Sequence, residues 1–315
     1  MKCILAIDGG GTRTQCLAYT HDCGSIGRSE SGPSNHLLVD RETVRRSIDQ
    51  ATSAALFAAG VQRHETFVSA GLAGIDFDGR GAAEMQALLS SLGLPATLLN
   101  GDMVVAHAGA LAGAPGVLAL AGTGSVVLAV DQCGRRAKVG GWGPIYGDEG
   151  SALSVGQRAL RAAAQAVDGR GPATSLVEGI VDAWHLSDFR DTIERVYLEH
   201  TEPREIAALA PIVAQAAELG DDVARSILRL CGQEIAKGVL AAIRGIEFER
   251  FPIAVSWNGS LLNCCEPVRR ELAAALASAL PATVLVAPRF SAVEGALLLG
   301  AKALGWEIPC TLRST

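Results

Sequence analysis

The stretch CILAIDGGGTRTQCLAYT (residues 3–20) decides the fold, because an apolar run leads directly into a glycine-rich turn. Residues 3–7 have the composition of a short buried strand, and residues 14–19 and 25–28 are expected to be two further strands. The glycines at 9–11 allow the backbone to approach a ligand closely. The chain is therefore expected to open with a glycine turn that joins two strands of a sheet.

The stretch VLALAGTGSVVLAVDQCG (residues 117–134) repeats this order of apolar strand, Gly-Thr turn and further strands. Two halves that open in the same way indicate an internal duplication. Elsewhere, helical periodicity and short apolar runs alternate, which favours an α/β fold with mostly parallel sheets and ligands near the carboxyl ends of the strands. The expected helices are 42–59, 81–92, 102–112, 261–280 and 291–304, and the remaining expected strands are 67–70, 97–99, 136–139, 253–256 and 283–286.

A chain of 315 residues is long enough for two domains. We place the N-terminal domain at residues 1–115 and expect the last helix, within 290–305, to complete it. The larger second domain spans 116–289 and contains a helical insertion at 151–244. A ligand that must be enclosed would bind in a central cleft between the two domains.

Composition excludes several classes of function. The net charge of −6 argues against a nucleic-acid-binding protein, which needs a basic surface. The apolar stretch 103–130 is interrupted by glycines and a proline, so it is not expected to span a membrane. Eight scattered cysteines and a first strand that reaches Asp8 without a signal sequence favour a reducing cytoplasm.

Three turns have the features of phosphate- or nucleotide-binding loops. In the first, Gly10, Gly11 and Thr12 offer backbone N–H groups, and Asp8 is placed to hold Mg²⁺, through water. Gly122, Thr123 and Gly124 repeat this arrangement, and Gly259 and Ser260 follow the third apolar strand at the start of an expected helix. A tight hairpin turn without a ligand is the alternative for each one taken alone. Neither a Walker A motif nor a strand-linked Gly-x-Gly-x-x-Gly occurs.

In this order the three turns resemble the phosphate-1, phosphate-2 and adenosine motifs of the actin, Hsp70 and sugar-kinase superfamily. The segment GGWGPIYGDEGS (140–151) resembles that of N-acetylglucosamine and glucosamine kinases in the BadF/BadG/BcrA/BcrD ATPase family. Further short matches extend the resemblance from residue 4 to about 304: Ser34-Asn35-His36, Gly71-Leu72-Ala73-Gly74, Asn100-Gly101-Asp102 and Ser291–Ala296. The resemblance implies two ribonuclease H-like (actin-like ATPase) domains, the cofactors ATP and Mg²⁺, and an amino sugar as substrate.

The resemblance also assigns roles to individual residues. It makes Asp102 the catalytic base, for which the alternative is a helix N-cap. It places Asn35 and Asp148 in the sugar pocket, for which the alternatives are a turn residue and an N-cap of the helix near Ser151. Trp142 either contacts the sugar or is a buried loop residue. The implied substrate-binding set is Asn35, Gly71, Asp102, Gly124, Trp142, Gly143 and Asp148.

The same resemblance leaves alternatives open. The first expectation is transfer of the ATP γ-phosphate to N-acetylglucosamine, giving the 6-phosphate, and the second is a glucosamine or N-acetylmuramic acid kinase. An activator ATPase of a 2-hydroxyacyl-CoA dehydratase or benzoyl-CoA reductase would need cysteines for an iron–sulfur cluster. Cys133 has no matching second cysteine until Cys231, which disfavours that class. Relatives of this kind are often dimers, so a homodimer stays open.

Overall fold

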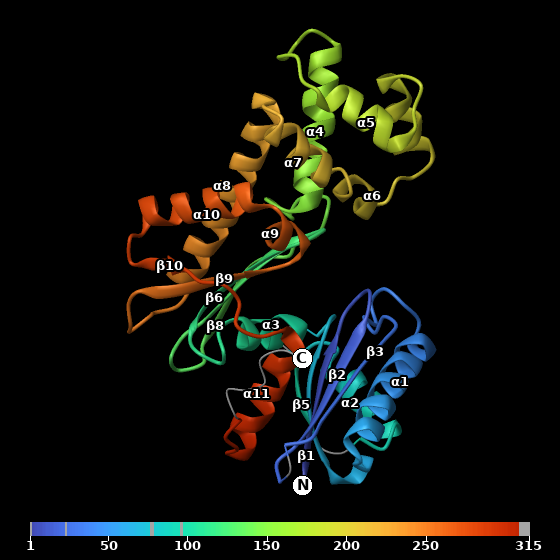
Figure 1. Ribbon diagram of the computed structural model, residues 1–315, viewed down its shortest axis with the longest axis vertical. Coiled ribbons are helices and arrows are strands. Elements are labelled where there is room, and N and C mark those ends of the chain that lie inside the picture. The colour runs from blue at the N-terminus through green and yellow to red at the C-terminus, as the bar shows by residue number, and fades with distance from the viewer. Residues whose placement is uncertain (1, 23, 76–78, 95–96, 309–315) are drawn as a thin grey trace. The chain divides into compact units, whose positions relative to one another are not determined.

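The computed structural model describes residues 2–22, 24–75, 79–94 and 97–308, and these form two compact units (Figure 1). Unit 1 consists of the described residues within Met1–Ala114 and Ala287–Thr315. Unit 2 is Pro115–Val286. Each unit is an α/β structure with its own five-stranded mixed sheet.

The sheet of unit 1 has the strand order β3-β2-β1-β4-β5. Strands β1, β2 and β3 form an antiparallel meander, and β4 and β5 extend the sheet in parallel with β1. The sequence therefore predicted the opening hairpin correctly, and the strands run somewhat beyond the expected apolar cores. Their bounds are β1 Cys3–Gly9, β2 Thr14–Thr20, β3 Ile26–Ser31, β4 Thr66–Leu72 and β5 Thr97–Gly101.

Helices cover both faces of this sheet, because β1 is apolar on both sides. Cys3, Leu5 and Ile7 pack with α1 (Arg41–Ala59) and α2 (Ala82–Ser91). Ile4 and Ala6 point the other way and pack with α3 (Asp102–Ala110) and α11 (Ala292–Leu304). The last helix thus lies beside the first strand, as Figure 1 shows. A strand buried on both faces appears in the sequence as a continuous apolar run.

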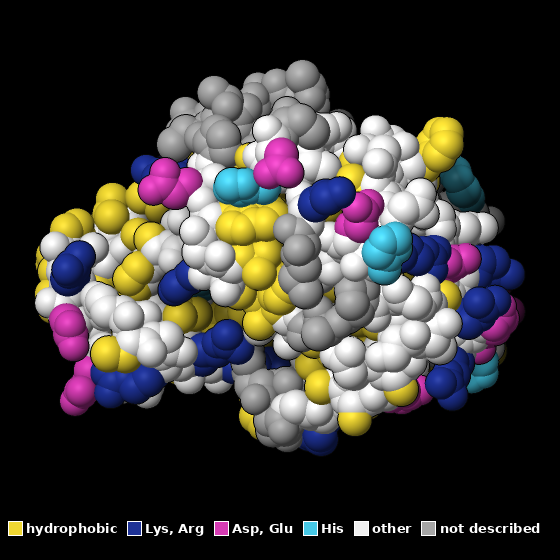
Figure 2. Space-filling view, turned by 90° about the horizontal axis from the view of Figure 1, so that it is seen from below, with side chains coloured by type: hydrophobic (Ala, Val, Ile, Leu, Met, Phe, Trp, Pro, Cys, Tyr) yellow, Lys and Arg dark blue, Asp and Glu magenta, His cyan; other side chains and the backbone are white. Residues whose placement is uncertain are grey.

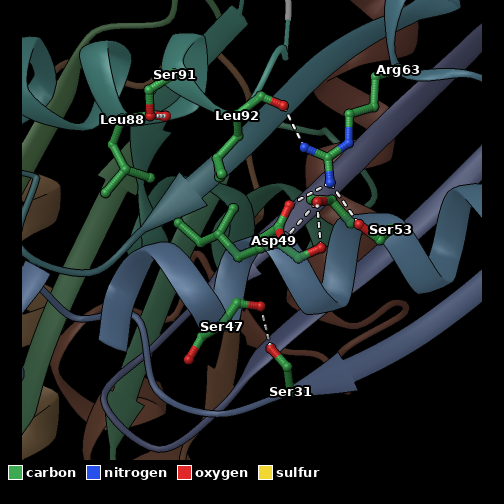
Figure 3. Close-up of polar contacts among 10 residues, drawn as sticks. Ser31, Ser47, Asp49, Ser53, Arg63, Leu88, Ser91 and Leu92 are labelled. Atoms are coloured by element: carbon green, nitrogen blue, oxygen red, sulfur yellow. Dashed lines mark hydrogen bonds and ion pairs between the residues drawn. The ribbon is translucent and has the colours of Figure 1, made fainter. Parts of the chain in front are cut away.

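A polar network in unit 1 joins α1 to β3, to Arg63 and, through Arg63, to the end of α2 (Figure 3). Arg63 donates to the carboxylate of Asp49 and the hydroxyl of Ser53, both on α1, and to the carbonyl of Leu92 at the end of α2. The Ser31 hydroxyl donates to the carbonyl of Ser47 at 2.6 Å, which ties β3 to α1. These bonds connect segments that are distant in sequence, and they contact none of the expected site residues.

Unit 2 repeats the topology of unit 1, with the strand order β10-β9-β6-β7-β8. Strands β6, β7 and β8 form the antiparallel part, and β9 and β10 continue in parallel with β6. Because β6 occupies the place that β1 has in unit 1, the shared connectivity agrees with an internal duplication. The bounds are β6 Gly116–Ala121, β7 Ser125–Val130, β8 Arg136–Gly140, β9 Ile253–Asn258 and β10 Thr283–Leu285.

The helical segment between β8 and β9 makes unit 2 different from unit 1. Helix α8 of this segment and α10, which follows β9, lie along the sheet, and α4 to α7 extend beyond it (Figure 1). The expected single helix at 261–280 is wrong: it is broken at Cys265, because Pro267 lacks an N–H and its ring clashes with the preceding turn. The helices are α4 Ala152–Val167, α5 Leu176–Trp184, α6 Pro203–Ala207, α7 Ala210–Glu218, α8 Asp222–Arg244, α9 Ser260–Cys264 and α10 Glu266–Ala279.

Charges of both signs are interspersed on the surface. On the face drawn in Figure 2, Lys and Arg side chains lie among Asp and Glu side chains. Ion pairs at the surface include Lys2 with Glu65 and Arg45 with Glu42. Within the described ranges, no helix combines the length and the apolar character needed to cross a membrane.

Candidate active site

In unit 1 the expected functional residues lie along one edge of the sheet. Asp8 in β1 is in register with Gly71 in β4, which is in register with Asn100 in β5. Because these three strands are parallel, their carboxyl ends meet at the same edge, where open α/β sheets bind ligands. Asp102 follows β5 directly as the first residue of α3.

The two acidic residues at this edge interact electrostatically. Burial raises the pKa of the Asp8 carboxyl, the charge of Asp102 raises it as well, and the Arg13 guanidinium opposes the shift; together they bring the pKa to about 7. Two carboxyl groups that disfavour each other's charge form a place where a cation is stabilising. No group of three or more His, Cys, Asp or Glu in the described part of the chain could hold a metal by itself. Mg²⁺ suits such a site, since it commonly binds one or two carboxylates together with substrate phosphates.

Asp102 is not the N-cap of α3, so that alternative is wrong. Gly101 occupies the N-cap position, and Asp102 is the first helical residue. The Asp102 carboxylate accepts a hydrogen bond from the N–H of Met103 at 2.8 Å. The side chain is half-buried at the carboxyl edge of the sheet, which leaves it able to contact both a ligand and the helix start.

The turn after β1 presents N–H groups outward. The Gly10 N–H donates to the Arg13 carbonyl at 2.9 Å, and the Gly10 carbonyl accepts from Ser34 and Asn35. These bonds fix the turn from the inside. Gly11 and Thr12 are exposed, and their N–H groups meet no acceptor among the described residues. Two adjacent unengaged N–H groups are what an oxyanion of a phosphate requires.

Asn35 has the turn geometry that was its alternative assignment. Its side-chain oxygen accepts from the Leu37 N–H at 3.0 Å, an Asx turn. A Cβ added at Gly74 would lie 3.2 Å from that oxygen and 2.5 Å from the Cε1 atom of His36, so both side chains pack against this glycine. The NH₂ group of Asn35 and the second lone pair of its oxygen can still contact a ligand, and its substrate role stays a prediction.

Gly71 and His36, in the same region, have surroundings that the sequence did not predict. Gly71 is buried, and a side chain there would collide with Val105 of α3, so close packing explains the glycine. His36 has a buried Nδ1 atom that meets no hydrogen-bond partner among the described residues. No sequence signal predicts that, because its surroundings come from Gly74 and Gly81 in another loop.

In unit 2 the second and third turns pack against each other. Strands β6 and β9 are parallel neighbours with Leu120 in register with Asn258, so the turns that follow both lie at the carboxyl edge. Gly259 has a φ of +96°, and a Cβ there would collide with the carbonyl of Ala121. The N–H groups of Thr123 and Gly124 meet no acceptor within the described residues, as in the first turn. At position 259, both the positive φ and the lack of room for a Cβ beside Ala121 require glycine.

A cavity of about 480 Å³ opens beside these two turns, within unit 2. Thr123 and Ser260 belong to its wall, together with Ala152 at the start of α4. The opposite wall comes from α6, α7 and the residues between them, and four of its eight residues are alanines. This volume and mixture are typical of sites for small organic ligands. The sequence could not predict the wall residues, which are Arg204, Ala207, Ala208, Ala210, Pro211, Ala214, Gln215 and Glu218.

The turn before α4 holds Asp148 in an unusual conformation. Asp148 has a φ of +59°, which is uncommon for residues other than glycine, although aspartate and asparagine adopt it more readily than most. Its Oδ1 atom accepts from the N–H of Ser125 at 3.0 Å. The N-cap of α4 is Ser151, whose hydroxyl accepts from the Ser154 N–H, so the N-cap alternative for Asp148 is wrong. The residue instead joins this turn to the turn at 122–125.

Trp142 is not a buried loop residue, so that alternative is wrong as well. Its side chain is 67% exposed, and Ile145 and Tyr146 in the same loop are exposed too. Gly143 beside it has a φ of +86° and open space around its Cα. An exposed indole is available to a ligand, but contact of Trp142 or Gly143 with a substrate stays a prediction.

Comparison with known proteins identifies the family. The model of the BadF/BadG/BcrA/BcrD ATPase family matches residues 5–300. The chain is 30% identical to an N-acetylmuramic acid/N-acetylglucosamine kinase of Clostridium acetobutylicum, over 84% of this chain and 86% of that protein. It is 27% identical to a glucosamine kinase of Vibrio cholerae, over 96% and 97% of the two chains.

Comparison with solved structures agrees with these sequence matches. A candidate N-acetylglucosamine kinase from Chromobacterium violaceum superposes with a TM-score of 0.76 and 27% identity, over 95% of this chain and 99% of that one. A ROK-family glucokinase from Streptomyces griseus shares the fold at a TM-score of 0.55 and 16% identity, over 96% of this chain and 98% of that one. These matches confirm the expected pair of actin-like ATPase units. The chain therefore belongs to the BadF/BadG/BcrA/BcrD ATPase family.

Proposed function

We propose that this protein is an ATP-dependent kinase that phosphorylates an amino sugar, with N-acetylglucosamine as the first choice and its 6-hydroxyl as the acceptor. The observation that carries the proposal is the position of Asp102 beside Asp8, at the carboxyl edge that also holds the outward N–H groups of Gly11 and Thr12. This arrangement combines a base, a cation site and a phosphate site. The relatives named as amino-sugar kinases support the substrate class.

The nucleotide is assigned to the three turns. The turns Gly10-Gly11-Thr12 in unit 1 and Gly122-Thr123-Gly124 in unit 2 bind phosphate. The N–H groups of Gly10 and Gly122 donate within their own turns, so the donors are those of the two residues that follow each of them. Gly259 and Ser260 bind the adenosine, and the alanine-walled cavity next to Ser260 has room for a base and ribose. Asp8 would hold Mg²⁺ through water, and a bound ion would supply charge neutralisation for the transferring phosphoryl group.

The chemistry assigned to this chain's own residues is proton removal and positioning. The sugar hydroxyl oxygen bonds to the γ-phosphorus while the bond from that phosphorus to the β–γ bridging oxygen breaks. The hydroxyl proton moves to the carboxylate of Asp102, and ADP leaves with the bridging oxygen. Asp102 must be ionised for this step, and the first turn of α3 favours its negative charge.

The sugar is assigned to Asn35 and Asp148, with Gly71, Gly124, Trp142 and Gly143 around it. A hydroxyl that pairs with an amide or carboxylate is discriminated strongly, because a substrate without it leaves the protein group unpaired. Glucosamine and N-acetylmuramic acid remain the alternative acceptors, since relatives are named for them. An iron-dependent activator ATPase is the remaining alternative from a different class.

The test is a coupled ADP-release assay with ATP and Mg²⁺ across glucose, glucosamine, N-acetylglucosamine and N-acetylmuramic acid. We expect kcat/KM for N-acetylglucosamine or glucosamine to exceed that for glucose by at least about tenfold, equivalent to about 1.4 kcal/mol. Equal efficiency with glucose would reject the amino-sugar assignment. ATP hydrolysis that no sugar stimulates, together with bound iron in the purified protein, would reject the kinase in favour of an activator ATPase.

A further inference from the structure

The turn that contains Asp148 is bonded to the turn at 122–125 through several contacts within unit 2. The Asp148 carboxylate accepts from the Ser125 N–H at 3.0 Å. The Ser125 hydroxyl donates to the carbonyl of Glu149 at 2.7 Å. A Cβ added at Gly124 would lie 2.7 Å from Oδ1 of Asp148, so the carboxylate lies directly over that glycine. The two turns therefore behave as one hydrogen-bonded structure.

The start of α4 strengthens this connection. The N–H groups of Ala152 and Leu153 donate to the carbonyls of Gly122 and Thr123 at 2.8 and 3.2 Å. The next N–H, of Ser154, donates to the Ser151 hydroxyl. These helix-start N–H groups are thus used to hold the 122–125 turn from one side. The N–H groups of Thr123 and Gly124 remain as its donors for a ligand.

Asp148 keeps its left-handed conformation although it costs free energy. A non-glycine residue at φ +59° is disfavoured by about 1 kcal/mol or more, and such residues persist where surrounding contacts impose them. Here the contacts are the bond from the Ser125 N–H to the Asp148 carboxylate and the bond from the Ser151 N–H to the Asp148 carbonyl at 3.1 Å. A sugar ligand alone does not explain why the carboxylate is already oriented onto the adjoining turn.

We propose that Asp148 is a positioning residue for the phosphate-binding turn: by accepting from Ser125 it orients the Thr123 and Gly124 N–H groups, and so serves nucleotide binding before any sugar is present. The inference rests on the proposed function, because it takes the 122–125 turn to bind phosphate. It adds a role that a purely sugar-binding Asp148 would not have. The same hydrogen bond makes the turn that contains Asp148 and the turn at 122–125 move together.

The charge of Asp148 and its role as a hydrogen-bond acceptor are expected to have opposite effects on nucleotide binding, so substitutions can separate them. A carboxylate beside a phosphate site repels the phosphate, so removing the charge alone should strengthen nucleotide binding. Removing the oxygen that accepts from the Ser125 N–H should weaken nucleotide binding. Asp148→Asn removes the charge and keeps an oxygen acceptor, and Asp148→Gly removes both. Asparagine and glycine both tolerate positive φ, so neither substitution strains the turn.

The experiment measures the Kd of Mg-ADP by calorimetry, without sugar, for the wild-type protein and both variants. We expect Asp148→Gly to bind about tenfold more weakly, the effect of losing one hydrogen bond to a charged group. Asp148→Asn should bind as tightly as wild type or more tightly. Circular dichroism and thermal unfolding establish that all three proteins are folded.

Two results would overturn the inference. Wild-type affinity in both variants would mean that Asp148 acts on the sugar alone. Equal weakening in both would mean that the charge matters and the acceptor does not. A wild-type protein that binds no Mg-ADP would instead reject the proposed function itself, so the two failures are distinguishable.

Discussion

Asp102→Asn is the substitution that tests the proposed chemistry most directly. Asparagine has nearly the same shape, and its oxygen can still accept the Met103 N–H bond that the structure shows at 2.8 Å. What it lacks is the ability to take a proton from the attacking hydroxyl. A positioned general base contributes about 10²- to 10⁴-fold in rate, or roughly 3 to 5 kcal/mol of barrier. We expect kcat to fall by that factor and sugar affinity to stay nearly unchanged.

The structure also bounds the effect of this substitution on stability. Asp102 lies in the first turn of α3, where a negative charge contributes about 0.3 to 1 kcal/mol. Its charge also raises the pKa of Asp8, so its removal relieves a repulsion that partly offsets the loss. The change in Tm should therefore stay within about 4 °C. Loss of activity without loss of fold is the expected signature.

The assay is coupled ADP release for kcat, with calorimetry for the sugar Kd and thermal unfolding for Tm. Glu84→Gln is the matched control, because Glu84 is an exposed acidic residue in the first turn of α2. It makes the same change of charge at the same kind of helix position, outside the proposed site. If Asp102→Asn keeps more than about a tenth of the wild-type kcat, Asp102 is not the base.

Three further predictions concern the sugar, the turns and the last helix. Asp148→Asn should weaken sugar binding by about 1 to 3 kcal/mol through a poorer partner for a hydroxyl, and an unchanged sugar Kd in calorimetry would remove Asp148 from the sugar site. Gly259→Ala should destabilise unit 2 by about 1 to 3 kcal/mol in urea unfolding, because the side chain meets both positive φ and the Ala121 carbonyl; wild-type stability would contradict the packing of the two turns. Burial alone would raise the pKa of Glu294, but hydrogen bonds from Ser291 and Arg28 lower it below its ordinary 4.5, so its ionised form stabilises the protein at neutral pH. Glu294→Gln should therefore lower Tm at pH 7, and the difference from wild type should shrink as pH falls below 4.5; a difference independent of pH would contradict the ion pair with Arg28.

Local pattern accounts for the parts of the site that the sequence predicted well. Buried strands appear as apolar runs, and the turns after them need glycine, so the positions of Asp8, Gly122–Gly124 and Gly259 followed from short-range patterns. The register of parallel strands then placed Asp8, Gly71 and Asn100 at one edge. Residue type alone also left a helix N-cap as the alternative for Asp102 and Asp148, and only the structure showed that Gly101 and Ser151 occupy those positions.

By itself the sequence determined the two α/β sheets, their repeated opening and the glycine turns, because strand burial and turn geometry depend on neighbouring residues. Only the tertiary structure decided which groups meet. The bond from Ser125 to Asp148, the packing of Gly259 on Ala121 and the alanine-walled cavity each join segments far apart in the chain. Alanines and backbone N–H groups have no distinguishing sequence signal, since their role comes from what packs against them. The physical reason is that a hydrogen bond or a cavity is set by distances between elements, which periodicity along one element does not specify.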